Sequence, residues 1–312
     1  MVKPPITLAS RARGALLGHA CGNALGVPTE FLGSPESIRQ RYPDGVREIV
    51  RQDTPGSPHD DDVAMAVVLG EWAAEGNRDA RDLLERWLGW ARADGRGIGI
   101  WTRRALAIYA ERRQPPTRRD SQGQAGNGAV MRALPIALAT LHSPRNLISA
   151  TLHTAELTHP EPAASWPAVA VNVAAHCLLK GRRDFIPDVI AALEAQVDVP
   201  REVLDAVRRV PFGRREALPI TGPDSGYAVN TMEIALWFAH HEPDLERGLV
   251  WLASAGGDTD TNAAVAGGLL GARDGEGVIP ARWLSAIAER DRLVALAERL
   301  VGAAATTGTS RA

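Results

Sequence analysis

Apolar residues recur every three to four positions through most of this chain, whereas runs that alternate apolar and polar residues between turn signals are scarce. A half-buried strand needs such alternation, so the spacing predicts an all-α fold. The clearest helical stretches are 63–74, 82–93, 129–141, 163–179, 227–240, 262–271 and 281–301. In the last of these, one stripe holds Trp283, Ile287, Val294, Ala297 and Val301, as a core-facing helix requires.

Charge and cysteine content narrow the class of protein. Lys and Arg total 35 against 37 Asp and Glu, a formal charge of −2, so no overall basic field would gather nucleic acid or anionic lipid. We expect neither a membrane nor an unmodified nucleic acid as a partner. The two cysteines, Cys21 and Cys177, lie in Ala/Leu-rich stretches and are expected to be free thiols in a reducing compartment, which makes a cytoplasmic location the default expectation.

A length of 312 residues allows two domains, but the chemistry-bearing clusters lie near both ends of the sequence and are useful only if they meet. We therefore expect one domain over 1–302, followed by a frayed tail at 303–312. Segments 43–58, 114–126 and 211–226 are rich in Pro, Gly and polar residues and are expected to be long loops, a length that usually accompanies function.

Three consecutive carboxylates follow a histidine in His59-Asp60-Asp61-Asp62, at the predicted start of a helix. One Asp could cap the helix and the others could favour its positive end, but one cap does not explain three. The alternative is a site where hard oxygen ligands hold a cation, with His59 as an optional nitrogen ligand.

A second acidic cluster is 256–262, Gly-Gly-Asp-Thr-Asp-Thr-Asn, which runs into a small-residue helix. Asp258 and Asp260 can face one ion only from a turn or the first helical residues, and Gly256 and Gly257 permit that turn. The spacing imitates an EF-hand loop, but that interpretation fails because the sixth position is Ala263 rather than Gly.

Two glycine-punctuated stretches complete the pattern. The first spans 18–31 and ends in an isolated acid, Glu30; its glycines, four or so apart, indicate close helix packing. The second spans 123–135 and runs from a glycine loop into a helix, where the backbone N–H groups of Gly126, Asn127 and Gly128 could cradle a phosphate or diphosphate.

Taken in order, these elements resemble the ADP-ribosylglycohydrolase family, which includes the dinitrogenase reductase activating glycohydrolase and ADP-ribosyl-arginine and ADP-ribosyl-serine hydrolases. The resemblance covers nearly the whole chain and rests on 22–26 (Gly-Asn-Ala-Leu-Gly), Glu30, 59–62, 126–132 (Gly-Asn-Gly-Ala-Val-Met-Arg), Thr158-His159 and 256–261. It implies a compact all-α domain with a central cleft for two divalent cations, Mg²⁺ or Mn²⁺. Clustered carboxylates agree with this, because without cations they would be forced largely neutral.

The resemblance also implies roles for individual residues. The metal ligands would be His59, Asp60, Asp61, Asp258, Asp260 and Thr261. The groups lining the substrate would be Glu30, Gly126, Asn127, Gly128, Met131, His159, Tyr227, Gly256 and Gly257. The proton acceptor would be Asp260 or Glu30, and the sequence does not choose between them. Residues such as Met131 and Tyr227 more often belong to the core than to a cofactor site, although either could line the cleft. His159 could merely hydrogen-bond a neighbouring loop, and Arg132 is expected in solvent or paired with an acid.

Two positions depart from the usual pattern of the family. Asn23 stands where an aspartate is common, which removes a negative charge. His59 stands where a ligating threonine commonly precedes the Asp pair, and an imidazole would favour Mn²⁺ over Mg²⁺. The register is open by one residue, because Asp60 could instead take the threonine position, with Asp61 and Asp62 as the pair. We prefer His59 at that position, because variants of the motif with three Asp also occur in the family.

The expected activity is divalent-metal-dependent hydrolysis of the glycosidic bond between ADP-ribose and a protein side chain or small conjugate, through orientation and Lewis acidity. Two alternatives are a hydrolase of another N- or O-glycoside and a non-catalytic relative that binds ADP-ribose or serves structurally. The identity of the leaving group and the oligomeric state are not encoded in any motif of the sequence.

Overall fold

The computed structural model describes residues 5–50 and 59–308, and side chains up to residue 302. Within those ranges the chain is helical and has no β-strand; residues Gly126 and Tyr227 form an isolated antiparallel bridge. The α-helices are α1 Leu8–Gly26, α2 Pro35–Arg41, α3 Asp61–Ala74, α4 Ala80–Ala93, α5 Ile100–Arg112, α6 Arg118–Ser121, α7 Leu134–Ala139, α8 Leu147–Glu156, α9 Pro162–Leu179, α10 Ile186–Glu194, α11 Arg201–Arg209, α12 Ala228–His241, α13 Leu245–Ala253, α14 Thr259–Asp274, α15 Ala281–Ala286 and α16 Arg290–Gly308. The all-α prediction is confirmed.

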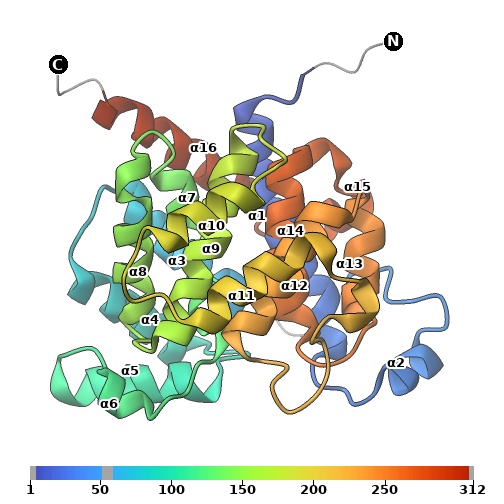
Figure 1. Ribbon diagram of the computed structural model, residues 1–312, viewed down its shortest axis with the longest axis horizontal. Coiled ribbons are helices and arrows are strands. Elements are labelled where there is room, and N and C mark those ends of the chain that lie inside the picture. Colours follow the sequence, from blue (N-terminus) through green and yellow to red (C-terminus); the bar gives the residue numbers. More distant parts are fainter. Residues whose placement is uncertain (1–4, 51–58, 309–312) are drawn as a thin grey trace.

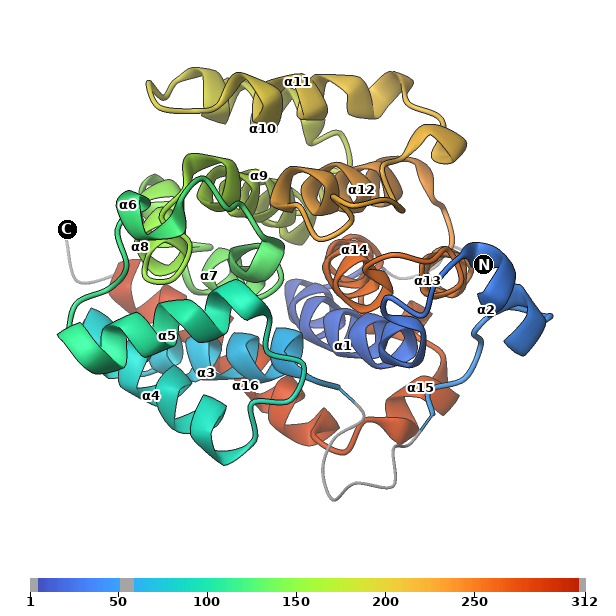
Figure 2. The same ribbon diagram turned by 90° about the horizontal axis from the view of Figure 1, so that it is seen from below.

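The helices are stacked in layers around α1 and α14 (Figures 1 and 2). Figure 2 shows α10 and α11 as an outer layer over α9 and α12, with α14 and α1 beneath them and α3, α4 and α16 on the far side. Helix α9 is long and apolar enough to cross a membrane, but 89% of its apolar stretch Pro162–Leu179 is buried inside the protein. Its apolar composition is therefore that of a core helix.

Helices α1 and α14 have the most extensive contact in the structure, and a row of glycines allows it. A Cβ atom at Gly18 would lie 2.3 Å from the carbonyl oxygen of Gly267, and one at Gly22 would lie 2.1 Å from that of Ala263. No real Cβ atom approaches a backbone so closely, so the two backbones touch only because side chains are missing there. This contact confirms the close packing that the glycine spacing predicts, and it holds the amino end of α14 against the carboxyl end of α1.

Two predicted helices are divided in the structure. The 129–141 stretch forms a 3₁₀ turn at Asn127–Ala129, a further turn, and then α7, because Pro135 lacks a backbone N–H and is accommodated only in a first turn. The 281–301 stretch breaks into α15 and α16 at Ile287, whose backbone is extended. The break places Glu289 against His59, so a tertiary contact prevails over the helical periodicity there.

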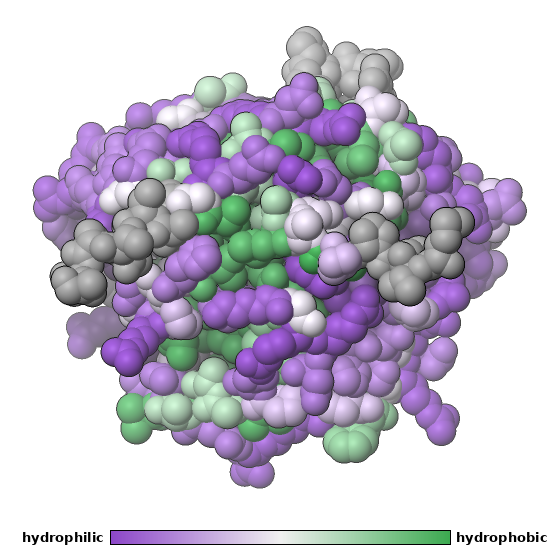
Figure 3. Space-filling model, turned by 90° about the horizontal axis from the view of Figure 1, so that it is seen from above, coloured by the Kyte–Doolittle hydropathy of each residue, from purple (hydrophilic) through white to green (hydrophobic). Residues whose placement is uncertain are grey.

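The long-loop predictions hold in part. The 114–126 segment contains the short helix α6, and the 211–226 segment contains the 3₁₀ turn Arg215–Ala217. Of the 43–58 segment, 51–58 lie outside the described residues. Helix α16 runs to Gly308, six residues into the stretch predicted as a tail, and 309–312 are again outside the described residues. Figure 3 shows one face of the molecule, with apolar side chains gathered near its centre.

Candidate active site and metal centre

The site lies where the carboxyl end of α1 meets the amino end of α14. A Cβ atom at Gly26 would lie 2.4 Å from the Cα atom of Asp260, so this second backbone approach fixes the first turn of α14. Asp258 is the residue before α14, and Asp260 and Thr261 lie in its first turn, all buried. Helix packing thus sets two carboxylates beside Asn23, the last polar residue of α1.

Asn23 forms hydrogen bonds to both acidic clusters. Its side-chain amide donates to Asp60 at 2.8 Å, to Asp62 at 2.7 Å and to Asp260 at 3.4 Å. Its carbonyl oxygen accepts from the backbone N–H of Asp60 at 3.1 Å. Asn23 is fully buried, so an amide at this position supplies donors to three carboxylates where an aspartate would add a further negative charge.

The Asp run at the start of α3 is turned inward rather than used for capping. Asp60 is the residue before the helix, yet its side chain makes no capping hydrogen bond to α3. Asp60 and Asp61 are 6% exposed and Asp62 is fully buried. Nearby, Gly97 has a positive φ of 76°, and a Cβ atom there would lie 2.8 Å from Oδ1 of Asp61. The loop before α5 therefore closes directly over these carboxylates.

Glu30 approaches the carboxylates from the loop after α1. It is half-buried, and the backbone N–H of the next residue, Phe31, donates to the carbonyl oxygen of Gly257 at 2.9 Å. Gly256 and Gly257 both have positive φ, and a Cβ atom at Gly257 would lie 2.2 Å from the carbonyl oxygen of Ile220. The two glycines therefore shape the turn that brings Glu30 and Asp258 together.

Burial and mutual repulsion disfavour ionisation throughout this group. Burial is the main cause that raises the pKa of Glu30 to about 7, followed by the charges of Asp60 and Asp258. Burial also raises the pKa of Asp62 and of Asp260 well above the usual range, and neighbouring carboxylates add to it. Hydrogen bonding from Asn23 opposes the rise at Asp60. Such a cluster is costly unless positive charge compensates it.

The donor set fits divalent cations. Glu30, Asp60 and Asp260 can each offer an oxygen to one ion, and Asp60, Asp61 and Asp62 to another. Three buried oxygens, Oδ1 of Asp62, of Asp258 and of Asp260, have no hydrogen-bond donor among the described residues. All of these potential ligands are carboxylate oxygens, the ligand type that Mg²⁺ and Mn²⁺ prefer. The two groups of potential ligands share Asp60, so two ions held by them would be neighbours.

His59 is placed differently from the prediction. Its Nε2 lies 2.7 Å from a carboxylate oxygen of Glu289, at the break between α15 and α16, and it belongs to neither group of potential ligands. The structure brings Asp62 to the carboxylates instead. This arrangement favours the register left open by the sequence, with Asp60 in the position that precedes the Asp61–Asp62 pair. With its Nε2 at Glu289, the imidazole of His59 gives no reason to expect Mn²⁺ in place of Mg²⁺.

The 126–128 loop lies beside Asp258, but its asparagine side chain is occupied by protein groups. The Asn127 amide donates to Oδ2 of Asp258 at 2.7 Å and to Thr231 at 3.0 Å. Its backbone N–H donates to the carbonyl oxygen of Gly226 at 3.1 Å. Asn127 therefore orients a carboxylate of the site, a role that its place in a glycine loop does not indicate.

A buried polar chain connects this loop to His159. Arg132, 1% exposed, donates to the carbonyl oxygen of Gly128 at 2.8 Å and to the hydroxyl of Thr158. That hydroxyl lies 2.8 Å from Nδ1 of His159. Because Thr158 accepts from Arg132, its own proton is available for Nδ1, which leaves the ring proton on Nε2. A Cβ atom at Gly128 would lie 2.9 Å from that Nε2.

Charge at this chain follows from its burial. Burial lowers the pKa of His159 well below its usual value, and the nearby cation of Arg132 lowers it further, so the imidazole is neutral. The Arg132 guanidinium lies over the ring of Trp87, 4.3 Å from its centroid, and the charge of Asp61 favours the cation. The expectation that Arg132 lies in solvent or forms an ion pair is wrong: among the described residues it contacts hydroxyl, carbonyl and aromatic groups.

Two residues predicted to line the substrate belong elsewhere. The side chain of Met131 is 4% exposed and packs in the core, while its carbonyl oxygen contacts His19. The hydroxyl of Tyr227 is directed to Glu202 on α11, which together with burial raises its pKa. Tyr227 is bridged to Gly126 by its backbone, and so supports the loop rather than presenting its ring to the carboxylates.

Sequence reasoning gave no role to two further residues of the site, Gly97 and Glu289. Gly97 stands in a Gly-rich stretch, 95–99, whose proximity to the carboxylates is not visible without the fold. Glu289 lies within a predicted continuous helix, and only the break in that helix brings it to His59. Neither position carries a local signal that separates it from an ordinary turn or surface residue.

The chain is similar to known proteins along most of its length. The family model described as ADP-ribosylglycohydrolase matches residues 4–310. The chain is 33% identical to the ADP-ribosyl-[dinitrogen reductase] glycohydrolase of Rhodospirillum rubrum, over 88% of this chain and 89% of that protein. It is 26% identical to the ADP-ribosylarginine hydrolase Tri1 of Serratia proteamaculans, over 93% of this chain and 78% of that protein. A solved structure described as an ADP-ribosylglycohydrolase-related protein complex superposes with a TM-score of 0.78 at 32% identity, over 95% of this chain and 99% of that chain. The carboxylate cluster thus lies in a glycosidic-bond hydrolase, and the chain belongs to the ADP-ribosylglycohydrolase family.

Proposed function

We propose that this enzyme uses two divalent cations to hydrolyse the bond between the anomeric carbon of ADP-ribose and a side chain of a modified protein. The observation that carries the proposal is the buried cluster at the α1–α14 contact, where three carboxylate oxygens lack a hydrogen-bond donor within the part of the chain that the structure describes. Cations held by Glu30, Asp60 and Asp260 and by Asp60, Asp61 and Asp62 would allow these groups to ionise together, and would supply Lewis acidity at the anomeric centre.

The protein's own groups then orient the substrate. Glu30 is half-buried, whereas Asp260 is 2% exposed and contacts Asn23, so Glu30 is the carboxylate that a substrate reaches. We assign to it the acceptance of a proton from the attacking water. Neutral His159, with its proton on Nε2 beside Gly128, is placed to donate a hydrogen bond to an oxygen of ADP-ribose bound at the 126–128 loop.

The names of the relatives support an ADP-ribosylated protein as the substrate class. The Rhodospirillum rubrum protein is named for dinitrogen reductase and the Serratia proteamaculans protein for arginine. A modified arginine is therefore the first linkage to assay, with a modified serine and a plain nucleoside as comparisons. The two buried free thiols, Cys21 and Cys177, support a cytoplasmic setting for this reaction.

The test is release of free ADP-ribose from ADP-ribosyl-arginine and ADP-ribosyl-serine, with Mg²⁺, with Mn²⁺ and with EDTA. We expect release with either metal and none with EDTA. Asp260→Asn should abolish release while the protein stays folded, whereas Asp291→Asn, at an exposed position of α16, should retain it. Turnover that persists in EDTA would refute metal dependence. ADP-ribose that raises the melting temperature without any turnover would instead indicate a binding protein.

A further inference from the structure

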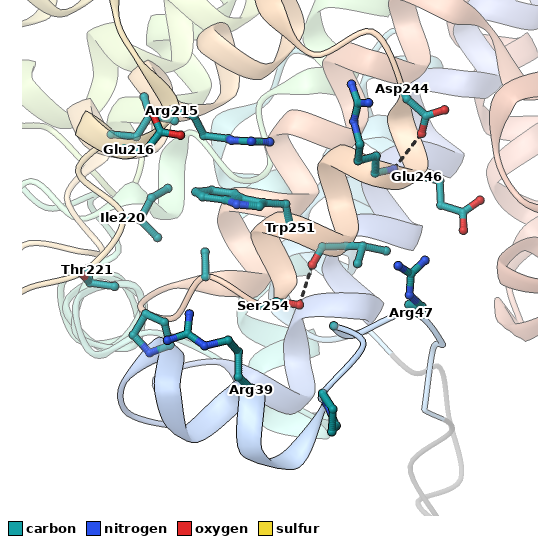
Figure 4. A pocket seen from close by; sticks show the side chains of 17 residues that line it. Arg39, Arg47, Arg215, Glu216, Ile220, Thr221, Asp244, Glu246, Trp251 and Ser254 are labelled. Atoms are coloured by element: carbon teal, nitrogen blue, oxygen red, sulfur yellow. Dashed lines mark hydrogen bonds between the residues drawn. The ribbon is translucent and has the colours of Figure 1, made fainter.

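A cavity of about 820 Å³ lies apart from the carboxylate cluster, on the side of the Gly256–Gly257 turn that faces α2 and α13 (Figure 4). Its walls come from α2, from 43–47, from 215–221, and from α13 with the turn that follows it. No member of the carboxylate cluster lines it. The volume falls in the range of about 300–1,000 Å³ that is usual for small-molecule sites. We name it the Trp251 pocket.

One wall of the Trp251 pocket is an aromatic surface set among apolar groups. The guanidinium of Arg215 lies over one side of the Trp251 ring, 5.3 Å from its centroid. In Figure 4, Arg215 stands on one side of the indole, and Ser254 and Arg39 lie on the other side, across the cavity. Apolar lining is supplied by Pro35, Pro43, Leu218, Ile220, Val250 and Ala255. A flat ring bound here would be stacked on the indole and removed from water.

Two arginines, Arg39 and Arg47, line the pocket at separate places (Figure 4). Arg39 pairs with Glu36, but both side chains are more than 60% exposed, and such a pair contributes little and is readily exchanged. The Nε of Arg47 donates to the backbone carbonyl oxygen of Asp44. This acceptor is neutral, so the hydrogen bond does not neutralise the guanidinium. Both guanidiniums line the cavity, so an anionic group near them would gain charge-assisted hydrogen bonds.

The acidic residues of the lining are held by other groups. Asp244 caps α13 by accepting from the backbone N–H of Arg247 at 2.8 Å. Glu246 bonds to Arg282, outside the pocket. Glu216 stands next to Arg215, on the wall away from Arg39 (Figure 4). The pocket therefore combines an aromatic wall with arginine side chains that can receive an anionic group.

We propose that the Trp251 pocket binds an organic anion that joins a flat ring to a sulfonate, phosphate or carboxylate, with the ring on Trp251 and the anionic group at Arg39 or at Arg47. We further infer that its occupant regulates hydrolysis. Gly256 packs against the pocket wall, since a Cβ atom there would lie 3.3 Å from Pro35 and 3.4 Å from Thr221. The same turn carries Asp258 and holds the loop of Glu30, so a ligand that braces it changes how these carboxylates are presented.

The probe for this proposal is 8-anilinonaphthalene-1-sulfonate, a fluorescent aromatic sulfonate, added to the folded full-length protein. We expect saturable binding to one site, weakened at least tenfold in Arg39→Ala/Arg47→Ala, because each lost charge-assisted contact accounts for roughly a tenfold change. Arg41→Ala, on the same helix but outside the lining, is the matched control and should bind as the wild type does. Equal affinity in the double variant and the control would overturn the proposal, as would displacement of the probe by ADP-ribose.

A second arm tests regulation and rests on the proposed function. Saturating probe should change the rate of ADP-ribose release at least twofold in the wild type and leave it unchanged in Arg39→Ala/Arg47→Ala, whose basal rate is expected to be normal. An unchanged wild-type rate would overturn the regulatory role. The binding arm needs no turnover, so the pocket stands or falls on its own if the enzyme proves inactive on the chosen substrates.

Discussion

Replacing Gly18 by alanine tests whether the α1–α14 contact sets the geometry of the site. The new Cβ atom would lie 2.3 Å from the carbonyl oxygen of Gly267, and ordinary contact begins at 3.4 Å, so the helices must separate by 3.4 − 2.3 = 1.1 Å at this point. The obstacle is backbone, which cannot turn to another rotamer. Asn23 is five residues further along α1, and a separation of that size would stretch its 3.4 Å contact with Asp260 on α14 beyond hydrogen-bonding range.

The expected size of the effect follows from two opposed terms. Overpacking against an immovable neighbour costs about 3 kcal/mol, and the better helix propensity of alanine returns about 1 kcal/mol, for a net loss of about 2 kcal/mol in the free energy of unfolding. At an unfolding entropy of about 2.1 cal/mol/K per residue, a chain of this length loses roughly 3 °C of melting temperature. The rate of ADP-ribose release should fall by more than the loss of folded protein explains, because the carboxylates of the site move apart.

The control is Gly89→Ala on α4, where a Cβ atom would meet nothing within 4 Å. This variant should gain about 0.5–1 kcal/mol from propensity alone. Urea unfolding of the two variants and the wild type, together with ADP-ribose release, measures both effects. If Gly18→Ala matches Gly89→Ala in stability and the wild type in turnover, the close helix contact does not determine the site, and the reasoning is refuted.

Three further predictions concern single residues of the site. Asp62→Asn should stabilise the metal-free protein and remove part of the pH dependence of its stability. Burial raises the pKa of Asp62 well above 3.8, so the native state holds more protons than the unfolded state, and stability falls as pH rises above about 4. Urea titrations from pH 5 to 8 in EDTA should show a shallower decline of stability in the variant, and an unchanged slope counts against the charge cluster. Gly97→Ala should weaken Mn²⁺ binding at least tenfold in calorimetry, because the new Cβ atom would lie 2.8 Å from Asp61. The control is Gly76→Ala, where φ is similarly positive but a Cβ atom would meet none of the described residues within 4 Å, and it should leave Mn²⁺ binding unchanged. Equal affinities in the two variants would contradict the placement of Gly97 over the carboxylates. Arg132→Met should raise the pKa of His159, because a cation that lowers it is lost, and should raise KM for the ADP-ribose conjugate more than it lowers kcat; NMR titration of the imidazole checks the first point, and an unmoved His159 resonance would contradict it.

Much of the site could be predicted because its chemistry is local in sequence. A run of Asp at a helix start, two Asp two residues apart after Gly-Gly, and glycines four apart each indicate a constraint that the structure confirms: inward carboxylates, a tight turn and close helix packing. The all-α fold follows from the same kind of periodic signal.

What the sequence could not supply depends on contacts between distant segments. The register of 59–62 was open because neighbouring positions before a helix point in different directions, and only the contacts of Asn23 and Glu289 distinguish Asp62 from His59. Arg132 is buried because the ring of Trp87 and the hydroxyl of Thr158 lie where the fold places them. Asn127 has the setting of a phosphate loop, yet its amide is used by Asp258.

The order in which the helices of the site are synthesised has a consequence for the cell. Asn23 leaves the ribosome early, but Asp260 is added only after 259 of the 312 residues have been joined. Until α14 emerges, the glycines of α1 are not covered by the helix that packs on them. The carboxylates at the start of α3 and the amide of Asn23 also lack Asp260 beside them. Contacts of such sequence separation form late and slowly. The acidic cluster is therefore complete only once α14 has been made, although most of its carboxylates come from the first quarter of the sequence.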